Sequence, residues 1–173
     1  MKALNAFLNK PEIKQLIQDD NLTDVYCQAP TTIRNRLTSY LHILGVDPLE
    51  KFEKFIPDGA FYGNQDLTEV RVPGNIQEVL PDAFAWCPKL HTIQFDSGVK
   101  ILRSCCLMGV PNLQTVYLPR TLTYIGQRVF AESGGNNVID VYYQGTKEDF
   151  SKVQLREGWN HQVALRLHFK HFK

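Results

Sequence analysis

A repeat of 23 residues runs through the middle of this 173-residue chain and constrains its fold more than any other feature. Shifting the sequence by one repeat aligns five columns of apolar residues. The columns are Phe61, Phe84, Leu107 and Phe130; Ile56, Val79, Leu102 and Ile125; Val70, Ile93 and Val116; Val72, Phe95 and Leu118; and Leu67, Leu90 and Leu113. After a two-residue insertion at Gly134-Gly135, Val138, Val141 and Tyr143 continue the last three columns. Self-similarity at a fixed period predicts a solenoid of stacked units.

Each unit contains one short run in which apolar and polar residues alternate. The runs are Glu69–Val72, Thr92–Phe95, Thr115–Leu118 and Asp140–Tyr143. Alternation with a period of two indicates a strand with one buried face, and such a strand cannot bury that face alone. Parallel stacking at about 4.8 Å per strand gives a continuous core. The sequence therefore predicts an α+β repeat protein, a short right-handed solenoid with a parallel β ladder on its concave side.

The repeat also resembles a known family. Residues 67–89 read L-T-E-V-R-V-P-G-N-I-Q-E-V-L-P-D-A-F-A-W-C-P-K, and residues 113–130 repeat the pattern with Leu118-Pro119, Ile125-Gly126 and Phe130. These stretches closely resemble BspA-like leucine-rich repeats, although Cys106-Leu107 stands where that pattern has Ala-Phe. The resemblance covers about residues 52–160 and implies a binding module. It implies no enzyme, no cofactor and no named partner.

The first fifty residues carry no trace of the repeat and are predicted to be helical. Ile33, Leu37, Tyr40, Leu41 and Leu44 form the apolar stripe of a helix that Gly45 ends. The pair Asp47-Pro48 is typical of a helix start, and we expect a short helix that holds Phe52 and Phe55. Residues 1–50 are then either a cap that seals the first coil or a module with a partner surface of its own, and the sequence leaves both possibilities open.

The remaining boundaries follow from where the repeat stops. We expect the solenoid, about four coils, over residues 51–146 and a C-terminal cap over residues 147–173. Residues 146–153 are predicted to form a short helix. The alternation of Val163, Leu165, Leu167 and Phe169 with polar residues predicts a terminal strand that closes the edge of the solenoid.

Composition and cysteine spacing exclude several classes of protein. Nineteen basic residues against eighteen acidic ones provide no overall attraction to nucleic acid or to an anionic membrane. No membrane-spanning run and no secretory signal is recognisable, so the sequence predicts a cytoplasmic protein. The four cysteines include no C-x-x-C pair, and we expect reduced, mostly buried thiols, with Cys105 the one that could be exposed. We therefore predict no enzyme, no cofactor and no metal site, even at His161, His168 and His171.

The candidate binding site is the polar side of the ladder. Its expected residues are Glu69, Arg71, Thr92, Gln94, Thr115, Tyr117, Asp140 and Tyr142. Tyr117 and Tyr142 are the most informative, since aromatic residues are less expected on a solvated strand face than Thr or Gln. Rigid tyrosines supply contact area at a small cost in side-chain entropy.

A second candidate is a basic flank made of Lys100, Arg103, Arg120 and Arg128, in a stretch without acidic residues between Asp96 and Glu132. Three functions follow from these features. We expect non-catalytic recognition of another protein, as an intracellular adaptor or as an inhibitor of a host protein of the phage or mobile-element type. The alternatives are nucleic-acid binding through the basic flank and a structural subunit of an assembly.

Overall fold

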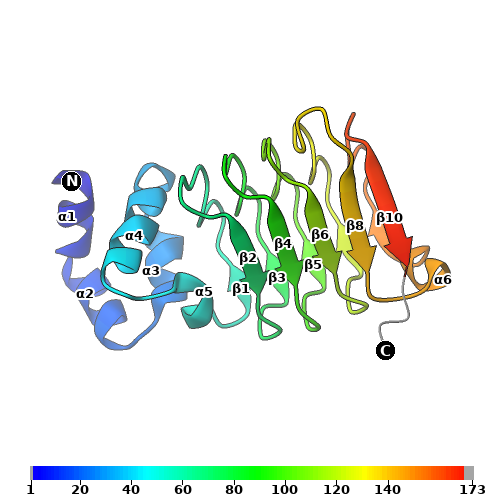
Figure 1. Cartoon of the computed structure of the whole chain (residues 1–173). Helices are drawn as coiled ribbons and strands as arrows, with labels where there is room; N and C mark the ends of the chain where they lie inside the picture. The colour runs from blue at the N-terminus through cyan, green and yellow to red at the C-terminus, as the bar shows by residue number, and fades with distance from the viewer. Residues whose placement is uncertain (1, 170–173) are drawn as a thin grey trace.

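The computed structural model describes residues 2–169 and contains a parallel β-solenoid that follows a group of helices (Figure 1). Every coil contributes one long and one short strand. The long strands form one parallel sheet, the long sheet, which consists of β2 (Glu69–Val72), β4 (Thr92–Phe95), β6 (Thr115–Leu118), β8 (Ile139–Tyr143) and β10 (Leu165–Phe169). The short strands form a second parallel sheet of β1 (Phe55–Ile56), β3 (Glu78–Val79), β5 (Ile101–Leu102), β7 (Tyr124–Ile125) and β9 (Gln154–Leu155).

The strand register follows the apolar columns of the sequence. Val70 pairs with Ile93, Ile93 with Val116 and Val116 with Val141, so that one column runs through four adjacent strands. All four residues are buried. Each long strand leads through a lower turn to a short strand, and each short strand leads through an upper turn to the next long strand (Figure 1). The predicted fold class, a short leucine-rich-repeat solenoid with a parallel ladder, is confirmed.

The C-terminal segment adds a fifth coil. After the short helix α6 (Lys147–Phe150), β9 pairs in parallel with β7 and β10 pairs in parallel with β8. The solenoid thus has five long strands rather than the expected four. A strand that joins a parallel sheet satisfies one side of its backbone and leaves the other side without a partner. The expected terminal strand is present as β10, which covers the edge of β8 and becomes the edge strand of the described residues itself.

Aromatic rings fill the inside of the coils and reach into the helices. Phe61 and Phe84 stack with centroids 5.0 Å apart. Phe52 packs edge-on against Phe61 at 6.2 Å and against Tyr26 at 5.1 Å, which extends the column to a helix. One predicted core position is wrong, because Val138 is 42 % exposed. The Gly134-Gly135 insertion displaces it, and the neighbouring Ile139 packs beside Gly134 and is buried instead.

Five helices precede the solenoid in the described residues; α3, α4 and α5 lie next to its first coil, and α1 and α2 lie on their outer side (Figure 1). They are α1 (Lys2–Leu8), α2 (Pro11–Gln18), α3 (Leu22–Gln28), α4 (Thr31–Ile43) and α5 (Pro48–Lys51). The expected cap of α5 is present, since the Leu49 backbone N–H donates to the Asp47 carboxylate at 2.9 Å. However, α5 ends at Lys51, and Phe55 belongs to β1 rather than to this helix.

The apolar stripe of α4 is only half buried. Ile33 and Leu37 pack into the core, whereas Tyr40 is 36 % and Leu44 is 57 % exposed. The core therefore covers the helix along its first turns, and the apolar side chains near its end are exposed. An exposed apolar surface remains at this end of the molecule.

Candidate functional site

The polar side of the long sheet carries two columns of side chains, which we call the ladder face. Backbone register aligns Glu69, Thr92, Thr115, Asp140 and Arg166 in one column, and Arg71, Gln94, Tyr117, Tyr142 and His168 in the other. All eight residues that the sequence analysis proposed lie on this face. Arg166 and His168 were missed because their strand was assigned to a cap. The alternation of Leu165, Arg166, Leu167 and His168 is the sequence signal that places them here.

Three aromatic rings stack across the last three strands of the ladder face. The rings of Tyr117 and Tyr142 have centroids 5.1 Å apart and planes 21° from parallel. The Tyr142 and His168 rings are closer, at 4.4 Å and 11°. The ring faces that meet in these contacts are therefore covered. The two tyrosines present their ring edges and hydroxyl groups to an incoming molecule. Neither hydroxyl has a hydrogen-bond partner within the described part of the chain.

Charged groups on both sides of this stack are already paired. At one end, Arg71 Nε lies 2.9 Å from Asp96 Oδ2, and Gln94 Nε2 donates to Asp96 Oδ1 at 2.9 Å. At the other end, Asp140 Oδ1 accepts from His168 Nε2 at 2.7 Å and from Arg166 at 3.2 Å. The hydrogen bond from His168 and the charge of Arg166 hold the Asp140 carboxyl pKa below its usual range. The centre of the ladder face is thus neutral and aromatic. It lies between two groups of paired charges, one around Asp96 and the other around Asp140.

The proposed basic flank does not form one free surface. Arg103 pairs with Glu78, Arg120 with Asp149 at 3.2 Å, and Arg128 with Glu132 at 3.2 Å. Lys100 Nζ lies 3.4 Å from the Gln77 side-chain oxygen.

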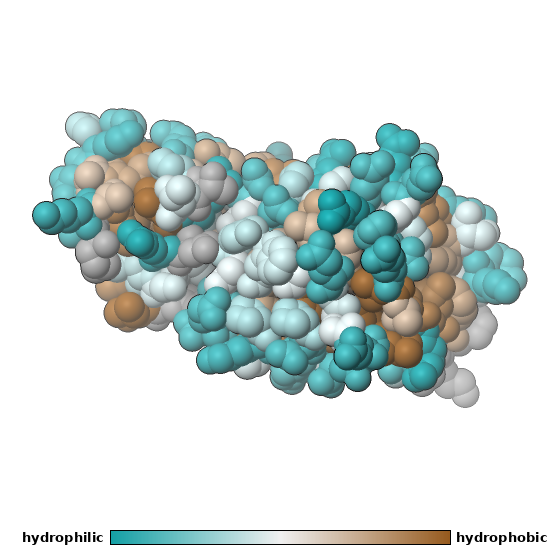
Figure 2. All heavy atoms as spheres, turned by 90° about the horizontal axis from the view of Figure 1, so that it is seen from above, coloured by the Kyte–Doolittle hydropathy of each residue, from teal (hydrophilic) through white to brown (hydrophobic). Residues whose placement is uncertain are grey.

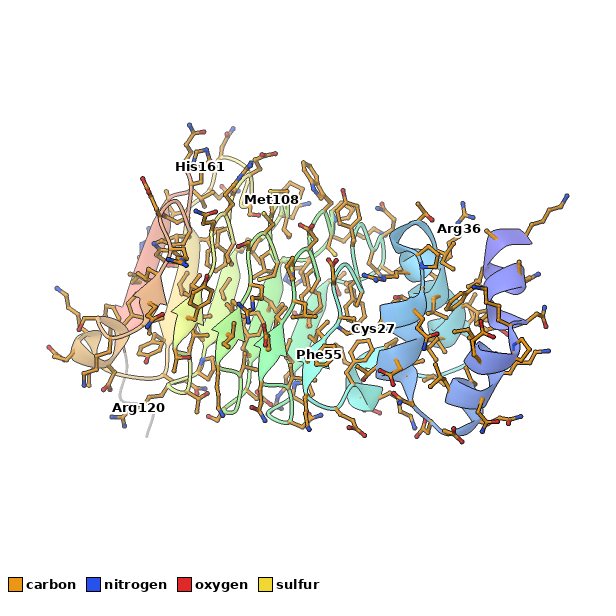
Figure 3. The ribbon with its side chains drawn as sticks, turned by 180° about the vertical axis from the view of Figure 1, so that it is seen from behind. Cys27, Arg36, Phe55, Met108, Arg120 and His161 are labelled. Carbon is orange, nitrogen blue, oxygen red and sulfur yellow. The ribbon has the colours of Figure 1, made fainter. Side chains whose placement is uncertain are left out.

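These four residues also lie at different places around the coil. Arg120 follows β6 in a lower turn (Figure 3), whereas Arg128 follows β7 and donates its backbone N–H to Gly158 in an upper turn. Carboxylates of neighbouring coils supply two of the partners, which explains how a stretch without acidic residues folds into a mixed surface.

The thiols lack the surroundings of a nucleophile. Cys87 and Cys106 are buried, and burial raises the pKa of Cys87 to about 12. Cys105 is partly exposed, and burial together with Asp82 raises its pKa as well. Within residues 2–169, no three His, Cys, Asp or Glu side chains are grouped as a metal site would require. His171 lies outside the described residues, so the structure does not test the prediction that His161, His168 and His171 form no metal site.

The comparisons with known proteins agree with the repeat. The family model described as a BspA type leucine rich repeat region, in six copies, matches residues 50–151, and the chain belongs to this family. Leucine-rich repeats generally mediate protein–protein contacts and are typically not enzymes. A comparison with curated proteins found no match.

One solved structure resembles the chain weakly. It is the crystal structure of a leucine rich cell surface protein from Faecalibacterium prausnitzii A2-165, with 13 % identity and a TM-score of 0.29. The match covers 52 % of this chain and 36 % of that one, so the chain spans about a third of the length of that protein. Separately, the described residues include no helix that is long and apolar enough to cross a membrane.

Proposed function

We propose that this protein recognises another protein through the ladder face, with Tyr117 and Tyr142 at the centre of the contact. The observation that carries the proposal is the pair of stacked tyrosines whose hydroxyl groups have no partner among the described residues. A partner that donates to or accepts from these hydroxyls replaces water and breaks no hydrogen bond within the described protein. Affinity in protein interfaces is concentrated in such central aromatic residues, surrounded by a polar rim.

The backbone beneath the tyrosines supports this role. β6 lies between β4 and β8, and β8 between β6 and β10, so both tyrosines sit on strands that are paired on both sides. The residues that alternate with Tyr117 and Tyr142 on these strands are buried. A site on such strands binds with little ordering of the backbone, which reduces the entropy lost on association.

The test is affinity capture from a lysate of the organism that encodes the protein, with and without nuclease, read by mass spectrometry. We expect one protein to be captured in stoichiometric amount, to survive nuclease, and to be lost with the double variant Tyr117→Ala and Tyr142→Ala. The double variant Tyr117→Phe and Tyr142→Phe keeps the ring stack and removes only the hydroxyls, so it should weaken capture less. A matched control is Lys89→Ala, at an exposed residue in an upper turn away from the ladder face.

Two results would contradict the proposal. Capture that persists in the alanine double variant would place the contact elsewhere on the protein. Capture that disappears with nuclease would identify nucleic acid as the ligand. A melting temperature close to that of the wild type confirms in each case that the variants are folded, because neither tyrosine contributes to the buried core.

The finer part of the proposal concerns the role in the cell. We propose a cytoplasmic adaptor or inhibitor, since a recognition face such as the ladder face suits a protein that links or blocks its partner. Cell fractionation tests the location, and an activity assay of the captured partner with and without this protein separates an inhibitor from an adaptor.

A further inference from the structure

A groove lies between the helical end and the first upper turn, away from the ladder face. Its volume is about 270 Å³, and its exposed lining is mainly apolar. Leu4, Tyr40 and Ile43 supply apolar lining from α1 and α4, while residues 63–66 form the opposite wall. Ile43 is 82 % exposed, which is unusual for an isoleucine in a folded protein. Seen from above, apolar residues lie among polar ones over this end of the molecule (Figure 2).

The side chain of Asn64, in the groove, is buried, yet only its oxygen has hydrogen-bond partners among the described residues. Asn64 is 4 % exposed, and its Oδ1 accepts the backbone N–H groups of Asp66 at 2.9 Å and Leu67 at 3.1 Å. These two bonds fix the orientation of the amide, so that Nδ2 is the free end. Nδ2 has no hydrogen-bond partner in the described part of the chain. Because Thr23 Oγ1 is the only fully buried side-chain atom without a partner there, the Asn64 Nδ2 must reach solvent, and Asn64 lines the groove.

The groove also contains an unpaired cation. Arg36 lies on α4 (Figure 3), is exposed, and makes no hydrogen bond or ion pair with the described residues, unlike Arg34 two positions earlier, which pairs with Asp58. Asn64 and Arg36 thus offer hydrogen-bond donors from opposite walls. Asp66, on the same wall as Asn64, makes no ion pair with the described residues, and its carboxylate disfavours an anion at its own end.

From these features we infer that the groove binds a partner segment in which an apolar side chain is next to a carboxylate. The apolar side chain lies against Leu4, Tyr40 and Ile43, and the carboxylate accepts from Arg36 and from Asn64 Nδ2. An extended segment suits the site because an exposed aromatic side chain follows in the next upper turn: the Gly63 backbone N–H donates to Ala85 of that turn, and the adjacent Trp86 is 42 % exposed. This site shares no residue with the ladder face.

The test is a nuclear magnetic resonance titration of the full chain with two peptides, acetyl-Gly-Glu-Phe-Gly-amide and its counterpart with glutamine in place of glutamate. We expect saturable shifts of the Asn64 side-chain amide and of the Gly63 and Gln65 backbone amides. The glutamine peptide should bind about tenfold more weakly, since a charge-assisted hydrogen bond to Arg36 is lost.

Four variants at exposed positions sharpen the test. Arg36→Gln should weaken the glutamate peptide about tenfold and leave the glutamine peptide unchanged. Ile43→Ser should weaken both peptides, whereas its matched control Leu44→Ser, at a residue outside the groove, should weaken neither. Asp66→Asn should strengthen the glutamate peptide or leave it unchanged, because it removes a repelling charge.

Four outcomes would overturn the inference. The first three are the absence of shifts at the groove amides up to millimolar peptide, equal binding of the two peptides, and weaker binding of the glutamate peptide after Asp66→Asn, which would show that Asp66 favours its binding. Shifts confined to the ladder face would also contradict it. Since the ladder-face variants leave the groove intact, failure of this inference and failure of the proposed function are distinguishable.

Discussion

The hydroxyl oxygen of Thr38 lies 2.7 Å from the carbonyl oxygen of Ala60, and this hydrogen bond joins helix α4 to the first coil of the solenoid. Because Thr38 donates its only proton to Ala60, the Tyr26 hydroxyl, also at 2.7 Å, must donate to Thr38. Thr38 is fully buried. Two buried hydrogen bonds, from Tyr26 to Thr38 and from Thr38 to Ala60, therefore connect the helices to the first coil next to the aromatic column. Terminal caps of this kind cover the end of a repeat array.

The first prediction compares the same substitution at two buried threonines. Thr38→Val should lower the free energy of unfolding by about 2 kcal/mol, because it leaves the Tyr26 hydroxyl and the Ala60 carbonyl without partners. Thr23→Val should leave stability unchanged or raise it, since the Thr23 hydroxyl is buried and has no hydrogen-bond partner among residues 2–169. Urea unfolding followed by circular dichroism measures both. Equal destabilisation by the two variants would show that the Thr38 hydrogen bonds are not what fastens the cap.

The second prediction concerns Trp86 and Gly109 on adjacent upper turns. Gly109 has a φ of +67°, and a Cβ at this position would lie 2.5 Å from the Trp86 ring. Gly109→Ala should therefore combine a left-handed backbone cost of about 1 kcal/mol with a steric clash. In a Trp86→Gly background the clash is absent and only the backbone cost remains, so the same change should be less destabilising. A double-mutant cycle by thermal unfolding gives the difference, and strict additivity would contradict this packing.

Thiol labelling gives the third prediction. Burial and Asp24 raise the pKa of Cys27, and burial and Asp82 raise that of Cys105, so both thiols carry less thiolate at pH 7.5 than a free cysteine. We expect slow maleimide labelling of these two and labelling of Cys87 and Cys106 only after unfolding. Mass spectrometry of timed samples identifies the order. Rapid labelling of Cys105 in the folded protein would indicate an activated thiol and would reopen the question of an enzyme.

The sequence predicts the repeats of the fold better than it predicts the two ends of the chain. Columns such as Val70, Ile93 and Val116 were predictable because burial repeats with the period of the chain. The fifth coil was not, since Leu167 follows its partner Val141 at a spacing longer than 23 residues, with helix α6 inserted between them. A fixed-period comparison cannot detect a coil of another length. The alternation of apolar and polar residues over Leu165–Phe169 predicts a strand but does not identify the strand it pairs with.

The residues of the ladder face on the first four long strands were predictable from the sequence, but the stacking of their aromatic rings was not. Strand alternation alone places Tyr117 and Tyr142 on one face. That they stack, and that His168 joins them, depends on side-chain rotamers and on a neighbouring strand that the period does not reveal. The groove beside α4 likewise depends on how residues 63–66 pack against the second half of the helix. The apolar stripe of α4 is continuous in the sequence and gives no sign that its second half is exposed.

The last prediction follows the protonation of Asp140 on the edge of the ladder face. Its carboxyl pKa is lowered chiefly by the hydrogen bond from His168 and further by Arg166, so His168→Ala should raise it toward the usual value near 3.9 more than Arg166→Gln does. A group whose pKa is lower in the folded state stabilises the fold above its unfolded pKa. That stabilisation is lost as the pH falls from about 4 through the lowered folded value. Carboxyl carbon chemical shifts against pH report the titration directly.

Asp149 serves as the internal reference for this titration. Its carboxyl pKa is also lowered, but by the Thr146 backbone N–H and by Arg120, neither of which contacts His168. Its titration should therefore be the same in His168→Ala and in the wild type. If Asp140 also titrates unchanged in that variant, the contact between Asp140 and His168 does not persist in solution. The ring stack at the edge of the ladder face would then lose the hydrogen bond that orients its last member.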